Sequence, residues 1–393
     1  MIDVHEKVKK LQVIFKIVER CNLVCSYCYY FFGGDETYLK RPPLVSDTTI
    51  VELGEYLEKA IKGHSIEHVE IVFHGGEPMM LPLNRFASCV RELKSKLANL
   101  TQLEFGIQTN GTLFTDEWID LFETEGVGVG VSVDGMKSEH DTFRIDKHGN
   151  TSFDKIISNI KRIKNRYPHT LGKSLGIINV LNPKVNYDQF LEFFAQELEV
   201  NEISILLPDC DNDEESPDHI SDKSEIGHAL KTIFDFKCRN PDVQIRRIDE
   251  LLENFQTYKV TEKKGEVKTK NVILVVHSDG QISIDDTLMP AQKWYAKQSK
   301  QHLAQHSFTD FLKHKGRQEL LDAYALVPSE CQSCIYRGIC GGGEPENRYD
   351  SKSGFDNRSV YCSELIDLYK YAIDHLEQNG YPAELIKEKL SCK

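Results

Sequence analysis

The sequence predicts a mixed α/β fold in which six strand–helix units wind a parallel sheet into a partial barrel. Short β-branched runs alternate with longer amphipathic stretches between residues 10 and 210. Runs rich in Val, Ile and Leu are typical of parallel strands that are covered on both faces. Six units fall short of the eight in a closed (β/α)8 barrel. The expected strands are 12–18, 68–73, 103–108, 127–133, 175–181 and 202–207.

Stretches with a helical period fill the gaps between these runs. Asp47 is the expected N-cap of a helix over 47–62, and Thr115 precedes a helix that runs to residue 125. Later in the chain, two apolar runs flank Asp279-Gly280, a turn signal that predicts a β-hairpin. The other expected helices are 84–98, 153–166, 187–198, 223–237, 247–257 and 363–377.

The pattern predicts three parts along the chain. Residues 1–222 carry the six units and end in an acidic, turn-rich surface loop at 209–222. Residues 223–270 are expected to form bridging helices and a charged linker at 261–270. Residues 271–393 hold the hairpin, a cysteine-rich segment and the final helix. We therefore expect one large α/β domain and a smaller C-terminal domain.

Composition excludes several classes of protein. The 393 residues include 48 Lys and Arg against 61 Asp and Glu, a formal net charge of −13, so the clustered basic residues of a general nucleic-acid binder are not expected. No apolar run is long enough to span a bilayer. The N-terminus lacks the apolar region and cleavage site of a signal peptide. The sequence therefore predicts a cytoplasmic protein that binds neither membrane nor nucleic acid.

The eleven cysteines are the most informative feature of the composition. Without an export signal they are not expected to form disulfides, because the cytosol keeps thiols reduced. Four are scattered, and we interpret them as buried or incidental thiols: Cys89, Cys210, Cys238 and Cys392. The other seven form an N-terminal triad, Cys21, Cys25 and Cys28, and a C-terminal group, Cys331, Cys334, Cys340 and Cys362.

The triad has the spacing C-x3-C-x2-C and directly follows the first expected strand. A structural zinc site or a closed [4Fe–4S] cube uses four ligands, so three thiolates suggest a cube with one open iron. In spacing and position, and with aromatic Tyr27 before the last cysteine, the chain resembles the radical S-adenosylmethionine (SAM) superfamily. The resemblance implies that SAM chelates the open iron and is cleaved by one electron to a 5′-deoxyadenosyl radical. A zinc knuckle is the alternative.

Residues after the second to fifth strands agree with this resemblance. Gly75 and Gly76 would let the backbone approach a ligand closely, and Glu77 offers an anion to a ligand ammonium. The resemblance implies that this Gly-Gly-Glu-Pro motif receives the SAM amino group. It also suggests further SAM contacts, although several of these residues could equally be ordinary turn, cap or surface residues. The candidates are Tyr27, Asn110, Ser132, Arg144 and Leu181.

The C-terminal cysteines supply four thiolates, the number that closes a [4Fe–4S] cluster, while a zinc ribbon is the alternative. Beside a radical SAM barrel their spacing resembles a SPASM domain, which carries auxiliary clusters. A complete SPASM domain has three further cysteines, and here the corresponding neighbourhood holds His277, Asp285 and Glu344. Carboxylates are poor Fe–S ligands, so we expect one auxiliary cluster rather than two.

The absence of these three cysteines distinguishes among the SPASM enzymes that the chain resembles. Anaerobic sulfatase-maturing enzymes keep all seven SPASM cysteines, whereas the segments 340–362 and 278–288 resemble cyclophane-forming maturases of the Fxs and XYE type. The resemblance implies a ribosomally made precursor peptide as substrate and a flavodoxin- or ferredoxin-type electron donor. The implied product has an aromatic ring carbon joined to the β-carbon two residues later. Asp286, which matches an Asp after the family's hairpin, is the candidate proton acceptor.

Two other functions remain open from the sequence. One is a sulfatase-maturase-like dehydrogenation, or thioether formation, on a peptide substrate. The other is a zinc-binding scaffold without catalysis. Only twenty residues precede Cys21, so we expect leader binding to use the barrel and C-terminal surfaces or another protein.

Overall fold

The computed structural model describes residues 8–32, 36–213, 223–256 and 270–391. Two compact units are each built from segments that are separate in sequence. Unit 1 comprises residues up to 132, 141–175 and 264–321, and unit 2 comprises 133–140, 176–263 and 322–393. Three sequence predictions lie outside the described residues: the acidic loop beyond 213, the charged linker up to 269 and Cys392.

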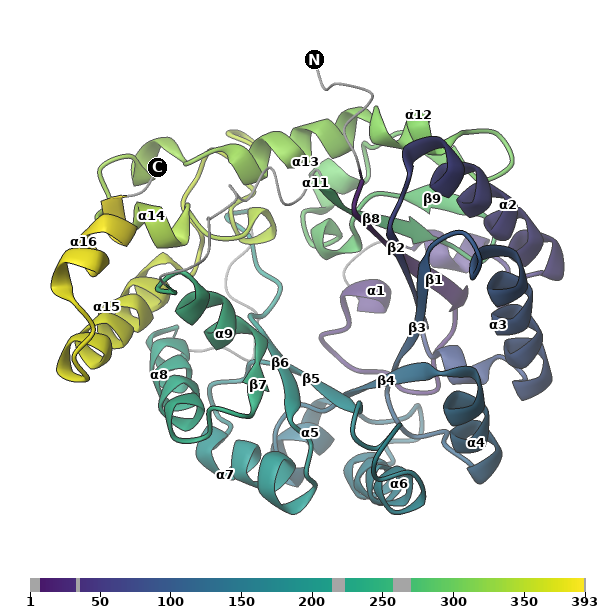
Figure 1. The fold of residues 1–393 in the computed structure, drawn as a ribbon, viewed down its shortest axis with the longest axis horizontal. Helices are drawn as coiled ribbons and strands as arrows, with labels where there is room; N and C mark the ends of the chain where they lie inside the picture. Colours follow the sequence, from purple (N-terminus) through teal and green to yellow (C-terminus); the bar gives the residue numbers. More distant parts are fainter. Residues whose placement is uncertain (1–7, 33–35, 214–222, 257–269, 392–393) are drawn as a thin grey trace. The chain divides into compact units, whose positions relative to one another are not determined.

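Unit 1 contains a mostly parallel sheet (Figure 1). Strand β1 pairs in parallel with β2 on one side and with β8 on the other. Strands β3 and β4 continue the parallel order beyond β2, while β9 and β10 add antiparallel pairs beyond β8. The bounds are Lys10–Val18 for β1, His68–Gly75 for β2, Gln102–Thr109 for β3, Val127–Ser132 for β4, Asn271–Val276 for β8, Gln281–Ser283 for β9 and Gln301–His302 for β10.

The expected hairpin is present, but it does not form a separate C-terminal body. Its turn is closed by a 2.9 Å hydrogen bond from His277 N to Gln281 O, and Gly280 has a φ of 82°. Its first strand extends the sheet beside β1. The three-part division by residue number stays a prediction, since both compact units are built from interleaved segments.

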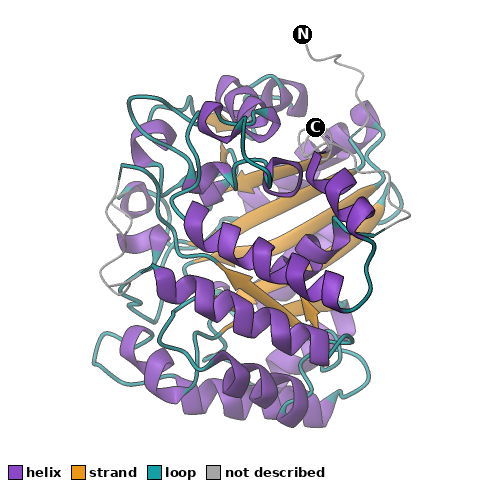
Figure 2. Ribbon diagram, turned by 90° about the vertical axis from the view of Figure 1, so that its left-hand side faces the viewer, coloured by secondary structure: helices purple, strands orange, loops and turns teal. Residues whose placement is uncertain are grey.

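Helices cover one face of the unit 1 sheet, where alternate residues of β1 such as Val13 and Phe15 are fully buried (Figures 1 and 2). Helices α2, α3 and α4 span Asp47–His64, Leu83–Leu97 and Asp116–Glu125. The N-cap of α2 is Ser46, which accepts from Thr49 N, so the assignment of Asp47 as the cap was wrong. Thr115 caps α4 as expected.

Unit 2 contains a second parallel strand set, β5 Gly176–Val180, β6 Glu202–Leu206 and β7 Gln244–Ile245. Helices α8, Ser224–Arg239, and α15, Cys362–Gln378, pack together through Phe234 and Tyr371, whose ring centroids are 5.9 Å apart. The other α-helices of the described residues are distributed over both units. They are α1 Tyr29–Phe32, α5 Lys137–Phe143, α6 Phe153–Arg166, α7 Tyr187–Glu192, α9 Arg246–Glu253, α11 Gln292–Tyr295, α12 Phe308–Leu312, α13 Lys315–Ala325, α14 Arg337–Cys340 and α16 Ala383–Ser391.

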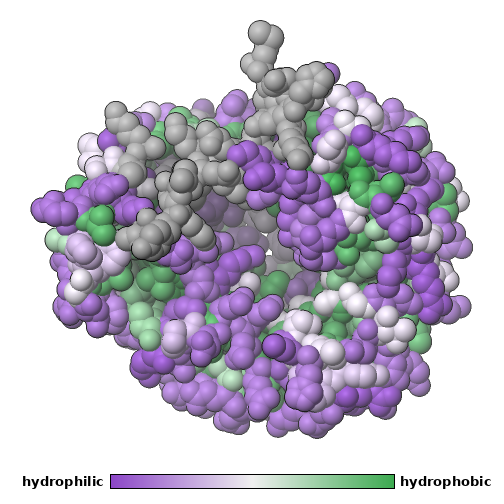
Figure 3. Space-filling view, in the orientation of Figure 1, coloured by the Kyte–Doolittle hydropathy of each residue, from purple (hydrophilic) through white to green (hydrophobic). Residues whose placement is uncertain are grey.

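All six expected strands are present, each within three residues of its expected ends. The predicted helix 187–198 is α helical only to Glu192 and continues as a π-helical turn over Phe193–Glu197. The face shown in Figure 3 is largely hydrophilic, in keeping with the net charge of −13. Across the described residues, no helix is both long and apolar enough to cross a bilayer.

Candidate functional site

The loop that carries the N-terminal triad follows β1 and is anchored to another part of unit 1. Val24 N donates to Ile145 O at 2.8 Å, and Leu23 forms a β-bridge with Asp146. Cys28 N donates to Cys25 O at 3.0 Å, which turns the chain into helix α1. The loop therefore has a fixed backbone path at the carboxyl end of β1, the edge at which parallel sheets carry their ligands.

The three thiols lie close enough to influence one another's ionisation. Burial, together with the negative charges of Glu77, Cys25 and Cys28, raises the pKa of the Cys21 thiol to about 12. Cys21 Sγ accepts hydrogen bonds from Leu23 N at 3.4 Å and from Asn110 Nδ2 at 3.8 Å. A cationic iron cluster would offset this repulsion. The donor set of three clustered thiols therefore fits a cube with one open iron.

No trio of His, Cys, Asp or Glu side chains in the described ranges is arranged to hold a single metal ion. A zinc ion requires its thiolates within about 2.3 Å of one centre. An iron–sulfur cube does not, because each thiolate binds a different iron.

Glu77 is fully buried, and donors from its own chain surround its carboxylate. The donors are Thr109 Oγ1 at 2.7 Å, Asn110 N at 2.8 Å and Met79 N at 3.1 Å. Burial raises its pKa to about 7, although these hydrogen bonds act in the opposite direction. The carboxylate thus ties the end of β2 to the end of β3, a role that the sequence did not suggest. Contact with a ligand ammonium stays a prediction.

Gly75 and Gly76 allow a close approach between the ends of β2 and β1. A Cβ on Gly75 would lie 2.1 Å from Val18 O, and a Cβ on Gly76 would lie 2.1 Å from Arg20 O. Gly75 also has a φ of 128°, which side chains rarely adopt. The two glycines let the end of β2 hydrogen bond to the end of β1, with Gly76 N 2.7 Å from Val18 O. Close approach of a ligand to these glycines stays a prediction.

Asn110 connects the triad loop to the end of β3. Its Nδ2 donates to Asn22 Oδ1 at 2.9 Å, while its Oδ1 accepts from Thr112 Oγ1 at 2.6 Å. Asn22 Nδ2 in turn donates to Thr112 Oγ1 at 2.9 Å. The sequence analysis missed Asn22 and Thr112. The adjacency of Asn22 to Cys21 and the Asn110-Gly-Thr turn sequence were the available signals.

Two other predicted SAM contacts lie together in unit 1. The Tyr27 ring packs edge-on against Phe143, with centroids 5.8 Å apart, and the Arg144 guanidinium lies 5.6 Å from the Tyr27 ring centroid. Ser132 Oγ accepts from Gln108 Nε2 at 2.8 Å. Leu181, in unit 2, is fully buried, so its side chain offers no exposed surface for an adenine ring.

Asp286 is buried in an ion pair with Lys16, which is itself fully buried. Lys16 Nζ lies 2.7 Å from Asp286 Oδ2, and Tyr29 OH donates to the same oxygen at 3.0 Å. Burial alone would raise the pKa of Asp286, but the charges of Lys16 and His74 outweigh it and lower the pKa to about 2. Asp286 is therefore ionised near neutral pH, and its low pKa makes it a weak proton acceptor.

His277 and Asp285, which lie near the positions where the resemblance would place further cysteines, have partners within unit 1. His277 Nε2 hydrogen bonds Ser283 Oγ at 2.9 Å, and its Nδ1 lies 3.5 Å from Oε1 of the buried Glu19. Asp285 Oδ1 accepts from Thr287 N at 3.1 Å and so caps the turn that begins at Asp286. Glu344 belongs to unit 2. His277 and Asp285 thus perform structural roles.

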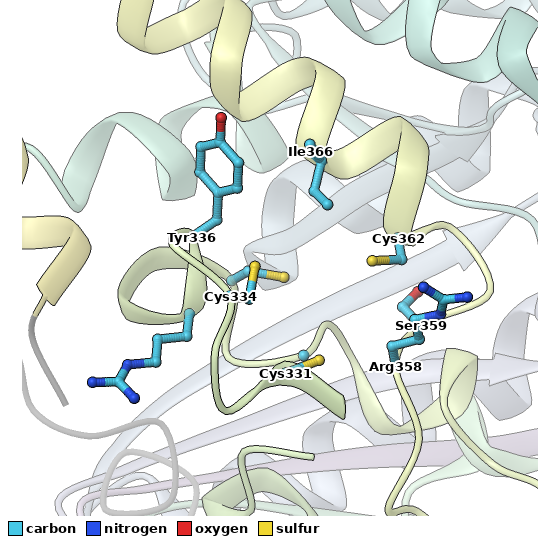
Figure 4. Close-up of a pocket in the computed structure, with 10 residues that line it drawn as sticks. Cys331, Cys334, Tyr336, Arg358, Ser359, Cys362 and Ile366 are labelled. Atoms are coloured by element: carbon cyan, nitrogen blue, oxygen red, sulfur yellow. The ribbon is translucent and has the colours of Figure 1, made fainter. Parts of the chain in front are cut away.

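The four C-terminal cysteines line one hollow of about 330 Å³ in unit 2, part of it open to solvent. Figure 4 shows the sulfur atoms of Cys331, Cys334 and Cys362 facing a common space. Burial and the charges of the other three thiols raise the pKa of Cys331 to about 11. Four convergent thiols whose ionised forms repel one another are the donor set of a closed [4Fe–4S] cluster.

The three glycines that follow Cys340 allow the tight turn of this site. Gly341, Gly342 and Gly343 all have positive φ. A Cβ on Gly342 would lie 2.4 Å from Pro328 Cδ, so only glycine fits there without a shift. Of the scattered cysteines, Cys89 and Cys210 are buried and Cys238 is half-buried, as expected of incidental thiols.

A second hollow lies in unit 1 beside the hairpin. Its volume is about 870 Å³ including open solvent. The wall combines apolar residues such as Ile282 and Phe311 with polar ones, including Arg41 and His314. Arg41 Nη2 donates to Gln281 Oε1 at 3.1 Å, and Arg41 Nη1 lies 3.5 Å from Tyr30 OH. Arg41 thus lines the hollow and also contacts Tyr30 of helix α1.

Residues 15–196 match the model of the radical SAM superfamily. The serine-type anaerobic sulfatase-maturating enzyme of Bacteroides thetaiotaomicron is 27% identical over 94% of this chain and 91% of its own. The cysteine-type anaerobic sulfatase-maturating enzyme of Clostridium novyi is 23% identical over 94% of this chain and 96% of its own.

Solved structures resemble the fold of this chain. The structure of native anSMEcpe with bound AdoMet matches with a TM-score of 0.78 and 20% identity over 94% of this chain and 98% of that one. Streptococcus suis SuiB bound to its precursor peptide SuiA matches with a TM-score of 0.61 and 16% identity over 90% of this chain and 76% of that one. The predicted α/β fold class with a parallel sheet is confirmed.

Proposed function

We propose that this chain, in which residues 15–196 form a radical SAM domain with S-adenosylmethionine and [4Fe–4S] iron as its cofactors, modifies a side chain of a peptide or protein substrate. The observation that carries the proposal is the convergence of three thiols on a loop fixed at the ends of β1 and β3. When bound, the cluster and SAM supply a 5′-deoxyadenosyl radical that removes hydrogen from an unactivated carbon.

The chain's own residues would hold and orient these cofactors. Cys21, Cys25 and Cys28 would bind three irons and leave the fourth for SAM. Asn110 would fix the loop through its hydrogen bonds to Cys21 and Asn22. Glu77, whose buried carboxylate is hydrogen-bonded to the end of β3, would provide negative charge for the SAM ammonium. Arg144, held against Tyr27, would pair with the SAM carboxylate.

The four C-terminal thiols would hold one closed auxiliary [4Fe–4S] cluster, which supplies an electron acceptor when bound. The single auxiliary site is supported by the contacts that His277 and Asp285 already make within the chain. A reducing cytoplasm would keep all seven thiols available for iron. A flavodoxin- or ferredoxin-type protein would deliver the electron.

At the finer level, we propose a ribosomal precursor peptide as substrate and a cyclophane as product. A ring carbon of an aromatic residue bonds to the β-carbon two residues later, and each carbon gives up one hydrogen. One hydrogen atom leaves with the deoxyadenosyl group, and the other leaves as a proton and an electron. The sequence segments after Cys340 and around the hairpin support this branch.

The second candidate is sulfatase maturation. It is favoured by the curated relatives, which are named as anaerobic sulfatase-maturating enzymes and match this chain along almost its whole length. In this case the product would be a dehydrogenated serine or cysteine side chain, with no new bond between residues. The two candidates share the radical step and differ in the fate of the carbon radical.

Co-expression with candidate peptides decides between them. One set of peptides should come from small open reading frames beside the gene, and the other should carry the serine or cysteine of a sulfatase. The proposal expects a precursor that lacks two hydrogen atoms, with fragment ions interrupted between an aromatic residue and the residue two positions later. A dehydrogenated serine or cysteine with complete fragmentation would favour sulfatase maturation.

Anaerobic reconstitution tests the class of protein. A radical SAM enzyme with one auxiliary cluster binds about eight irons per chain and cleaves SAM on reduction. Two zinc ions with no SAM cleavage would identify a zinc-binding scaffold and overturn both candidates.

A further inference from the structure

Arg348 is the largest fully buried side chain of the described chain, with 1% of its surface exposed. It belongs to unit 2 and follows the loop that carries Cys340. Its guanidinium donates only to backbone carbonyls. Nε and Nη2 reach Phe355 O at 3.1 and 2.7 Å, and Nη1 reaches Ala323 O at 3.0 Å.

These hydrogen bonds satisfy the donors of Arg348 but leave its charge uncompensated. Within the described residues, no carboxylate lies at ion-pair distance from the guanidinium. An isolated buried charge is strongly unfavourable unless an opposite charge lies nearby. An Arg cannot escape this cost by losing its proton. Negative charge nearby must therefore stabilise Arg348, and the carboxylates of Glu344 and Asp356 supply part of it.

The cysteine site is a further source of that charge. Arg348 packs beneath the glycine loop that follows Cys340, since a Cβ on Gly342 would lie 3.9 Å from Arg348 Cδ. Burial lowers the pKa of Arg348. The charge of Cys331 opposes this shift most, followed by the carboxylates of Glu344 and Asp356 and then by Cys340. The thiols thus stabilise the cation as the cation stabilises the thiolates.

We propose that Arg348 is the built-in counter-cation of the auxiliary [4Fe–4S] cluster and raises its reduction potential. The inference rests on the proposed auxiliary cluster. A [4Fe–4S] core with four thiolates is anionic and gains one more negative charge on reduction, so a fixed buried cation favours the reduced form. A higher potential would make the cluster a better acceptor for the electron that leaves the substrate.

The test measures the potential of the auxiliary cluster alone. A chain with alanine in place of Cys21, Cys25 and Cys28 removes the other cluster, and EPR-monitored redox titration then reports on the remaining site. In this background, Arg348→Gln should shift the reduction equilibrium about tenfold toward the oxidised cluster, about 59 mV for one electron. Arg348→Lys keeps the charge and should shift the equilibrium much less.

Arg358 provides the matched control. It lines the same hollow and acts on Cys362 by its charge, but it is exposed. Arg358→Gln should shift the equilibrium less than about threefold, and added salt should abolish the shift, because solvent screens exposed charges. The shift for Arg348→Gln should persist in salt.

The outcomes separate this inference from the proposed cluster. A background chain that binds zinc or no iron would refute the auxiliary cluster itself. A loaded cluster with the same potential in Arg348→Gln as in Arg358→Gln would overturn the role of Arg348. If the Arg348→Gln chain binds no auxiliary cluster, the Arg348→Lys chain decides between charge compensation and hydrogen-bond geometry. A loaded cluster near the original potential supports charge compensation, whereas loss of the cluster or a large shift assigns Arg348 to hydrogen-bond geometry instead.

Discussion

The buried pair of Lys16 and Asp286 shows what one residue contributes beyond its expected chemistry. The sequence suggested Asp286 as a proton acceptor because of its place after the hairpin. The structure adds that its charge neutralises a fully buried lysine at 2.7 Å. Local pattern does not reveal such a partner, because Lys16 lies on β1 and Asp286 follows β9.

Replacing Asp286 alone should therefore destabilise the protein. Asp286→Asn leaves Lys16 buried without a counter-charge, which costs about 3–5 kcal/mol of unfolding free energy. The double variant Lys16→Met, Asp286→Leu should recover most of that loss, since an apolar pair of similar volume avoids the desolvation cost. Urea denaturation of the three proteins measures the effect, and equal loss in both variants would contradict it.

The double variant also isolates the chemistry. If Asp286 accepts the substrate proton, the stable double variant should bind iron and cleave SAM yet form little cross-linked peptide. Product formation at the original rate, measured by mass spectrometry, would remove Asp286 from the mechanism.

His74 should make stability depend on pH. Burial and the charge of Lys16 lower its pKa from 6.5 to about 4. The unfolded chain therefore binds an extra proton between these values, so stability is complete above about pH 6.5 and declines as the pH falls toward 4. The decline should approach about 1.4 kcal/mol per pH unit for this group.

Anaerobic urea denaturation at several pH values between 7.5 and 5.5 checks this expectation. His74→Gln should flatten the decline. His277, whose pKa burial also lowers, should account for part of the slope that remains. A profile that is unchanged in His74→Gln would contradict the assignment.

At the scale of elements, apolar runs located the six strands well because each run is bounded by polar or turn residues. Strands β7 and β10 were missed because two residues cannot show a period. The N-cap of α2 was misplaced by one residue because Ser46 and Asp47 are both good caps. The parallel pairing of β8 with β1 could not be predicted either, since long-range register leaves no local pattern.

The junction of β1 and β2 should tolerate no side chain at Gly75. Gly75→Ala would place a Cβ 2.1 Å from Val18 O in a backbone conformation that alanine disfavours. We expect displacement of the triad loop and loss of about half of the bound iron, with the auxiliary cluster retained. Gly106→Ala is the control, because its Cβ meets no atom closer than 3.9 Å. Equal iron content in both variants would contradict this role for Gly75.

At the scale of the whole molecule, the two groups of clustered cysteines belong to different compact units. The triad lies in unit 1 and the four C-terminal cysteines in unit 2. The sequence points to both groups as candidate ligands because their spacings are local. Their assignment to interleaved units could not be predicted, because it depends on which distant segments pack together.

Removal of cysteines from the C-terminal site should therefore leave an iron–sulfur cluster bound at the N-terminal triad. A variant with Cys334→Ala and Cys340→Ala should lose about four irons and keep about four. It should still cleave SAM without substrate turnover, since the contacts of the triad loop with Asn110 and Ile145 lie within unit 1. Iron analysis and chromatography of 5′-deoxyadenosine measure the two properties. Complete loss of SAM cleavage would show that the two sites depend on each other.

The pairing of β1 with β8 has a consequence for synthesis of the chain. One long edge of β1 is completed by residues 271–276, which leave the ribosome long after β1 itself. At typical translation rates the delay is on the order of tens of seconds. During that time an apolar strand edge stands open to pairing with other chains. Productive folding of this protein therefore depends on shielding its first strand until its last third has been made.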